Sequence, residues 1–318
     1  MKQEFAYQGI KKKKKNYFEG WYYKNVTVDK KWTISIIPGI SYSKEKDCAF
    51  IQVIESINHK SYYIEYDIDD VVIHQNPVCI QIKNNYFYED YIDLDIHTAE
   101  LELTGFLYYS EQTKLKKTAY APTIMGPFSY LPMECYHSII SMHHYIDGVL
   151  SLNQTEIDFE DGIGYIEKDY GTSFPKEYTW IQTNTLEKDN LNYKKVSLFF
   201  SVAEIPTYFG HFNGFIAVFY LNNKEYRFTT YNGSKLIRIT KNNGIYKYVL
   251  KSGNKKLLIR IKPRNGLKLR SPKLGVMDDT VLESLDSVCH VTLYQKKKVL
   301  FQQKMRNTGY EKKEKPSK

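Results

Sequence analysis

The feature that most restricts the fold of this 318-residue chain is a set of similar segments that occurs twice in the same order. Trp21 begins a W-x-x-x-N pattern, and Trp180 begins another. The segments that follow match in order: TISIIP (33–38) with FFSVAEIP (199–206), AFIQVI (49–54) with GFIAVF (214–219), SYYIEYD (61–67) with EYRFTTYN (225–232), CIQIKNN (79–85) with LIRITKNN (236–243), DYIDLDI (90–96) with KKLLIRI (255–261), and MECYHSIISM (133–142) with LESLDSVCHV (282–291). Each match is weak alone, but their common order predicts two tandem modules of about 150 residues.

The repeated segments have the pattern of β-strands. Apolar and charged residues alternate, as in KSYYIEYDI (60–68), and no long segment has helical periodicity. The 29 Tyr and 16 Phe also favour strands. Short strands separated by Gly, Asn and Pro turns predict an all-β protein of antiparallel barrels or strongly curved sheets. We expect a first module at 17–160 and a second at 161–311, with disordered tails at 1–16 and 312–318.

The formal net charge of +9 includes a run of five lysines, Lys11–Lys15. Such runs are usually solvated chain ends. The alternative interpretation is peripheral contact with an anionic membrane surface, which attracts clustered lysines. We expect no nucleic-acid partner, because the sequence has no zinc-finger, helix-turn-helix or RNP pattern.

The four cysteines, Cys48, Cys79, Cys135 and Cys289, have neither metal nor redox spacing and are expected to be free thiols of a reducing compartment. The N-terminus has no apolar segment typical of a secretory signal, and no apolar stretch is long enough to span a bilayer. The sequence therefore predicts a cytoplasmic protein, with peripheral membrane contact left open.

Two dense blocks, residues 125–137 and 164–184, concentrate Pro, Gly, Trp, His and acids beside aromatics. The repeat shows which of their polar residues have a counterpart in the other module. Glu134 has a counterpart in Glu283, which suggests a structural role for this carboxylate. His137 corresponds instead to Asp286, and Asp169 has no counterpart. His137 and Asp169 are therefore stronger functional candidates than Glu134.

Glu167 and Asp169 are two residues apart, so on a strand their side chains share one face. Among aromatic residues such a carboxyl could act as a proton donor; alternatively, both acids cap backbone groups around the Gly171 turn. The histidines of the first block, His137, His143 and His144, have spacings that fit no common zinc site, so no metal is expected. His137 is the histidine expected to donate a proton or a hydrogen bond.

The blocks resemble the motifs of the tocopherol cyclase family. The matching segments are FEGWYYK (18–24), MGPFSYLPMECYHSIISMHH (125–144) and GYIEKDYGTSFPKEYTWIQTN (164–184), with Tyr170 where the family often has Trp. The resemblance covers residues 17–311. It implies two lipocalin-like β-barrels, and a reaction without a redox cofactor in which a prenylated hydroquinone alkene is protonated and the phenol oxygen captures the cation.

The resemblance further implies a proton donor in an apolar cavity with aromatic walls. The candidates for acid or hydrogen-bond partner are Glu134, His137, Glu167 and Asp169. The candidates for contact with a prenylated or polyene ligand are Trp21, Tyr136, Tyr170, Trp180 and His143, although core packing is the alternative for the tryptophans and Tyr136. A lipocalin-like carrier that binds an apolar ligand without chemistry remains the alternative function.

Overall fold

The computed structural model describes residues 3–9, 16–207 and 210–314. The chain divides into two compact units. Unit 1 comprises residues 1–174 with 268–280, and unit 2 comprises 175–267 with 281–318. In the described ranges, no helix is long and apolar enough to cross a membrane.

Unit 1 is built on a 12-stranded antiparallel sheet with the strand order β4-β3-β2-β1-β12-β10-β9-β8-β7-β6-β5, to which β11 adds by pairing with β10. The elements are β1 (Tyr17–Val26), β2 (Thr33–Tyr42), β3 (Cys48–Glu55), β4 (Lys60–Asp67), η2 (Ile68–Asp70), β5 (Val71–Gln75), β6 (Val78–Ile82), β7 (Asn85–Phe87), β8 (Tyr91–His97), β9 (Glu102–Ser110), η3 (Gly126–Tyr130), β10 (Cys135–Leu152), β11 (Thr155–Asp158) and β12 (Gly162–Gly171), where η marks a one- or two-turn 3-10 helix. β12 lies after the module boundary expected at residue 160, and it pairs with β1 and β10 of unit 1.

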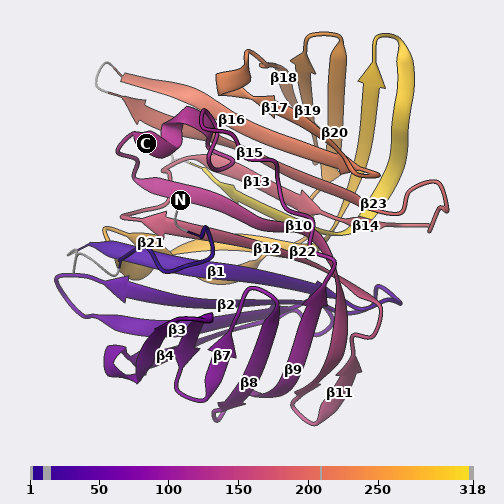
Figure 1. The fold of residues 1–318 in the computed structure, drawn as a ribbon. Coiled ribbons are helices and arrows are strands. Elements are labelled where there is room, and N and C mark those ends of the chain that lie inside the picture. The colour runs from indigo at the N-terminus through magenta and orange to yellow at the C-terminus, as the bar shows by residue number, and fades with distance from the viewer. Residues whose placement is uncertain (1–2, 10–15, 208–209, 315–318) are drawn as a thin grey trace. The chain divides into compact units, whose positions relative to one another are not determined.

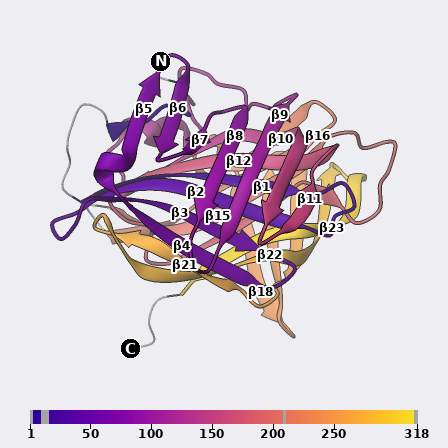
Figure 2. The same cartoon turned by 90° about the horizontal axis from the view of Figure 1, so that it is seen from below.

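Unit 2 is built on an 11-stranded antiparallel sheet with the order β17-β16-β15-β13-β23-β22-β20-β19-β18, to which β14 adds by pairing with β23 and β21 by pairing with β22. The elements of this sheet and its connections are β13 (Tyr178–Thr183), β14 (Thr185–Leu186), β15 (Val196–Thr207), β16 (Gly210–Leu221), β17 (Lys224–Thr229), η4 (Thr230–Asn232), β18 (Lys235–Asn242), β19 (Ile245–Ser252), β20 (Lys255–Lys262), β21 (Leu267–Lys273), β22 (Val276–Gln295) and β23 (Lys298–Lys313). Residues 268–280, which form most of β21 and the start of β22, belong to unit 1. Figure 1 shows the strands of both sheets and labels most of them, and Figure 2 labels β5 and β6.

The two strand orders have the same plan. Each sheet begins with four strands in reverse sequence order, β4 to β1 in the first and β17 to β13 in the second. The last strand of the repeat comes next, β12 or β23, and beside it lies a long strand, β10 or β22. A 3-10 helix, η2 or η4, follows the fourth strand in both cases. The all-β prediction with an internal repeat is therefore confirmed. One part of the expectation is corrected, because among the described residues each sheet has two edge strands and does not close into a hydrogen-bonded barrel.

The sheet of unit 1 bends around its own apolar core. Ile36 and Val53, from β2 and β3, belong to the same buried cluster as Ile80 and Leu94, from β6 and β8. Figure 2 shows β8 and β9 crossing the direction of β2 and β3. Curvature thus gives this open sheet a closed interior, since the apolar faces of its two ends pack on each other.

The N-terminal segment lies against the inner face of this sheet. Phe5 is fully buried and the indole Nε1 of Trp21 donates a hydrogen bond to its carbonyl at 2.8 Å. Lys168, also fully buried, donates from Nζ to Ala6 O at 2.8 Å and to Glu19 Oε1 at 2.9 Å. The disorder expected for residues 1–16 therefore does not extend to residues 3–9. The run Lys11–Lys15 lies outside the described residues.

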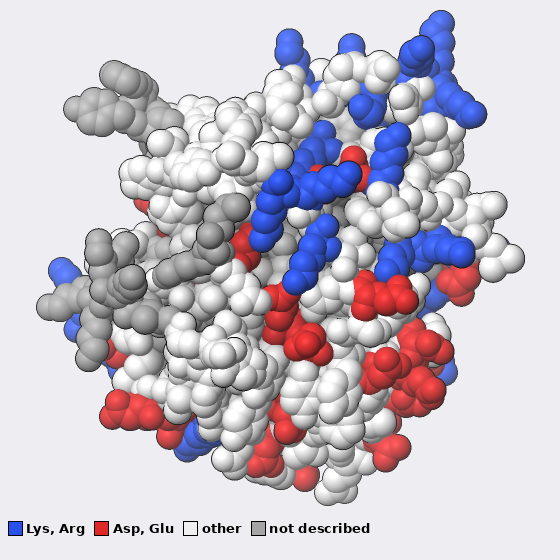
Figure 3. Space-filling model, in the orientation of Figure 1, with Lys and Arg blue, Asp and Glu red and all other residues white. Residues whose placement is uncertain are grey.

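The two units carry opposite charge. Unit 1 has 27 Asp and Glu against 20 Lys and Arg, whereas unit 2 has 9 against 25. In Figure 3 Lys and Arg side chains gather over the β19–β20 and β22–β23 hairpins of unit 2. The net charge of +9 thus originates in unit 2 and not in an even distribution of lysines.

Candidate functional site

Two paired strands of unit 1 bring a histidine between two carboxylates. Side chains alternate along β12, so Tyr165, Glu167 and Asp169 lie on one face and Ile166, Lys168 and Tyr170 lie on the other. His137 of β10 lies opposite Asp169 in the antiparallel register and therefore shares its face. The site thus follows from the register between β10 and β12.

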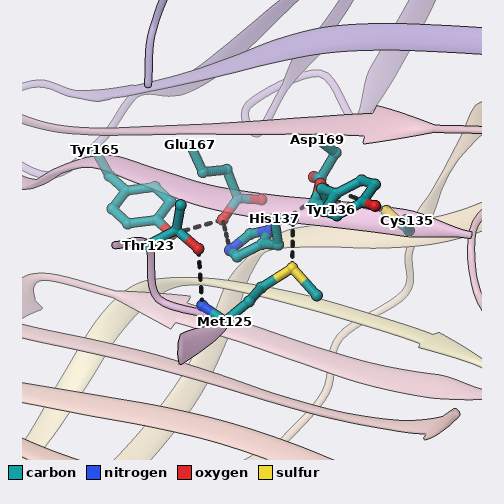
Figure 4. Close-up of polar contacts among 8 residues, drawn as sticks. All are labelled: Thr123, Met125, Cys135, Tyr136, His137, Tyr165, Glu167 and Asp169. Carbon is teal, nitrogen blue, oxygen red and sulfur yellow. Dashed lines mark hydrogen bonds and ion pairs between the residues drawn. The ribbon is translucent and has the colours of Figure 1, made fainter. Parts of the chain in front are cut away.

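The imidazole of His137 contacts both acids (Figure 4). Its Nδ1 lies 2.8 Å from Asp169 Oδ1, which is a hydrogen bond, and its Nε2 lies 3.6 Å from Glu167 Oε2, which is an ion-pair distance. The hydroxyl of Tyr165 donates to the same Oε2 atom of Glu167 at 2.6 Å. These contacts hold the ring between Asp169 and Glu167 in one orientation.

The surroundings of His137 keep it protonated. Burial opposes the charge of the imidazolium, but the nearby carboxylates of Asp169 and Glu167 outweigh that effect and raise the pKa of His137 to about 9. The histidine side chain is only 15% exposed, so solvent screens these charges weakly. At neutral pH the site therefore contains an imidazolium beside two acidic side chains.

The first sequence block supplies the support beneath the histidine. Pro127 in the first turn of η3 helps to fix the chain there. The backbone N–H of His137 donates to Met125 Sδ at 3.1 Å, and the N–H of Met125 donates to Thr123 Oγ1 at 3.1 Å. Neither Met125 nor Thr123 was among the candidates, because a thioether and a hydroxyl in a Pro-Gly segment carry no signal of their own.

Three candidate aromatics lie on the other face of the sheet. Tyr136 pairs with Tyr170, and their rings stack with centroids 4.9 Å apart. Trp21 pairs with Lys168 and is part of the buried core. The backbone of β12 thus separates these three rings from the histidine and its two acids.

The remaining candidates also lie apart from His137. Glu134 has an exposed side chain, and its carbonyl accepts a hydrogen bond from Thr172 N at 2.7 Å. His143 is buried with its ring edge-on to Tyr145. Trp180 is buried in unit 2, where its ring covers Gly309. The structure therefore brings together His137, Glu167 and Asp169 out of the nine candidate residues.

A divalent cation is the other species that this geometry could accept. One donor atom from each of His137, Glu167 and Asp169 lies within 4.8 Å of the other two. Three protein ligands with a position left for water are typical of catalytic zinc sites. The chemistry of the donor set thus fits a cation as well as a proton, and experiment can separate them.

Comparisons with known proteins agree with this fold. A search of curated proteins gives no match. Among solved structures, the AttH-type protein of Nitrosomonas europaea aligns with a TM-score of 0.55 at 14% identity, covering 98% of this chain and 94% of that one. CghA aligns with a TM-score of 0.54 at 8% identity, covering 93% and 87%. Kievitone hydratase from Nectria haematococca aligns with a TM-score of 0.50 at 11% identity, covering 96% and 93%.

The sequence itself matches one family, described as tocopherol cyclase-like, over residues 109–312. This range contains β10 and β12 and thus the three residues of the site. Since the match spans more than half of the chain, the protein belongs to the tocopherol cyclase-like family.

Proposed function

We propose that this protein is a cofactor-independent enzyme that cyclises or hydrates an isoprenoid alkene by proton transfer from His137. The observation that carries the proposal is the placement of a protonated imidazole between Asp169 and Glu167 on one face of the sheet. A positioned histidine that exchanges a proton with a reacting group is a general acid. Membership of the tocopherol cyclase-like family supports this reaction type, because the family takes its description from a cyclase.

The proposed reaction begins at Nε2 of His137, because Nδ1 is engaged with Asp169. The π electrons of a trisubstituted alkene take the Nε2 proton at the less substituted carbon, which leaves a positive charge on the tertiary carbon. A phenol oxygen of the same molecule, or a water oxygen, bonds to that carbon. The proton that this oxygen loses returns to Nε2, so no electron acceptor is needed.

The two acids stabilise the charged intermediate. When His137 has given up its proton, the carboxylates of Asp169 and Glu167 face the new carbocation, and opposite charges attract strongly where water is scarce. An apolar substrate that covers the site adds to the burial that already opposes the imidazolium charge. Substrate binding therefore makes the proton easier to release.

The proposed substrate class is a prenylated or polyene compound. Solved structures with the same fold include a hydratase, and CghA has been solved with Sch210972, so small-molecule binding is known among these proteins. The comparison supports a small-molecule substrate here. The substrate is proposed to contain an alkene because His137 is proposed to donate its proton to one.

The test offers prenylated hydroquinones to the protein in deuterated water. We expect ring-closed or hydrated product with one deuterium on the carbon that accepts the proton, detected by mass spectrometry. A chelator should leave turnover unchanged. Turnover that disappears with EDTA and returns with zinc would assign the site to a cation, and tight ligand binding without any product would favour the carrier function.

The rate should depend on the protonation of His137. The acid form of a group whose pKa is raised to about 9 predominates below that pH and is lost above it. We therefore expect kcat/KM to be level through neutral pH and to fall as pH rises through about 9. Glu167→Gln removes one carboxylate that raises the pKa of His137, so the fall should move to lower pH. A profile that is identical in both proteins would contradict the assignment.

A further inference from the structure

Unit 2 contains a long basic segment that has no acidic residue of its own. Between Tyr226 and Leu267 the sequence has eleven Lys and Arg and no Asp or Glu. This segment forms most of β17 and all of β18, β19 and β20. Proteins normally have positive and negative side chains interspersed on their surface. A region of this length with positive charges alone creates a positive potential that attracts a negatively charged partner.

The charge is densest where two hairpins adjoin. Lys296 N, in the β22–β23 turn, donates to Asn254 O of the β19–β20 turn at 2.6 Å. On the neighbouring strands Lys251 lies opposite both Lys235 and Lys256. We call the group at these turns the lysine cluster; it consists of Lys235, Lys251, Lys255, Lys256, Lys296, Lys297 and Lys298.

These lysines are not neutralised within the part of the chain that the structure describes. All are exposed except the half-buried Lys255. The ion pairs of the described residues use other cations, such as Lys304 with Glu187 and Arg264 with Asp286. The cluster therefore presents its positive charge to solvent.

We propose that the lysine cluster docks this protein on an anionic lipid bilayer. Clustered lysines are drawn to the negative surface of such a membrane. Val299, which follows Lys298, is 43% exposed, and the Tyr294 ring lies 4.2 Å from Lys256 Nζ. Aliphatic and tyrosine side chains beside lysines suit the boundary between headgroups and acyl chains.

The experiment measures binding of the full chain to vesicles by co-sedimentation at physiological salt. We expect binding to phosphatidylcholine vesicles that contain phosphatidylserine and none to pure phosphatidylcholine. The variant Lys251→Gln/Lys297→Gln/Lys298→Gln should bind about 100-fold more weakly, since each lysine near an anionic surface contributes about fivefold. Lys296, whose φ of 57° is unusual for a residue with a side chain, is left unchanged.

The matched control is Lys31→Gln/Lys44→Gln/Lys60→Gln, which removes the same charge from exposed lysines of unit 1. This variant should bind like the wild type, and replacing the three cluster lysines with arginine should preserve binding. Equal loss in both glutamine variants would overturn the proposal, as would duplex DNA of random sequence binding where vesicles do not. Because Lys11–Lys15 is intact throughout, retained vesicle binding by the cluster variant would also overturn it. Thermal melting checks that each variant folds.

Discussion

Replacing His137 with alanine should lower kcat by roughly 10²–10⁴-fold, the usual contribution of a general acid. The protein should still fold, because the ring is part of a polar site and not of the apolar core of unit 1. The measurement is product formation from a prenylated hydroquinone at saturating substrate. Ligand affinity should change little, which separates a lost proton donor from a lost binding surface.

Asp169→Asn is the companion change. It keeps the size of the side chain but removes the charge that holds His137 protonated, so we expect a large loss of kcat here too. Glu134→Gln is the control, because the Glu134 side chain is exposed and apart from the ring. Wild-type turnover in both His137→Ala and Asp169→Asn would remove the two residues from the mechanism.

Replacing Lys168 with methionine should destabilise unit 1 by about 3–5 kcal/mol, because it leaves the fully buried Glu19 without its cation. For a unit of this size the loss corresponds to a fall in Tm of roughly 10 °C. Thermal unfolding followed by circular dichroism measures it. The N-terminal segment should also become sensitive to protease, since Lys168 holds the carbonyl of Ala6.

The matched control for this second prediction is an exposed ion pair. Lys46 and Glu65 form such a pair at the surface, so Lys46→Met should leave the Tm close to that of the wild type. Replacing both Glu19 and Lys168 with methionine should recover stability relative to Lys168→Met, because no charge is then left buried alone. A Tm for Lys168→Met equal to that of the wild type would show that the buried pair contributes nothing.

The strands and their repetition were predictable from the sequence, because alternation with period 2 is a local property of each segment. The same local character made it harder to predict which strand of the first module corresponds to which strand of the second. The sequence pairs residues 90–96 with 255–261, yet β20 lies beside β22 as β9 lies beside β10, so the equivalent of 255–262 is 102–110. Any alternating strand resembles any other, and only hydrogen-bonded neighbours distinguish them.

The face on which a side chain lies was predictable only within one strand. Spacing correctly placed Glu167 with Asp169, but grouping Trp21 and Tyr170 with them required the register between strands, which no sequence pattern specifies. Closure of the sheets could not be predicted for the same reason, because it depends on pairing between the two end strands, which are β4 and β5 in one sheet and β17 and β18 in the other. The burial of Phe5 was hidden by the neighbouring lysine run.

Strand β12 carries two incompatible environments on alternate residues. Its even positions place Lys168 beside Trp21 in the interior, and its odd positions place Glu167 and Asp169 beside His137. Substitutions at single positions can adjust either side separately. A deletion or insertion of one residue between Gly162 and Ile166 would invert the rest of the strand, so that both acids would face the core and Lys168 would face away from it. Homologues should therefore vary in residue type along this strand but not in length, and a gap there would mark a relative that lacks both the contacts to the N-terminal segment and the group formed by His137, Glu167 and Asp169.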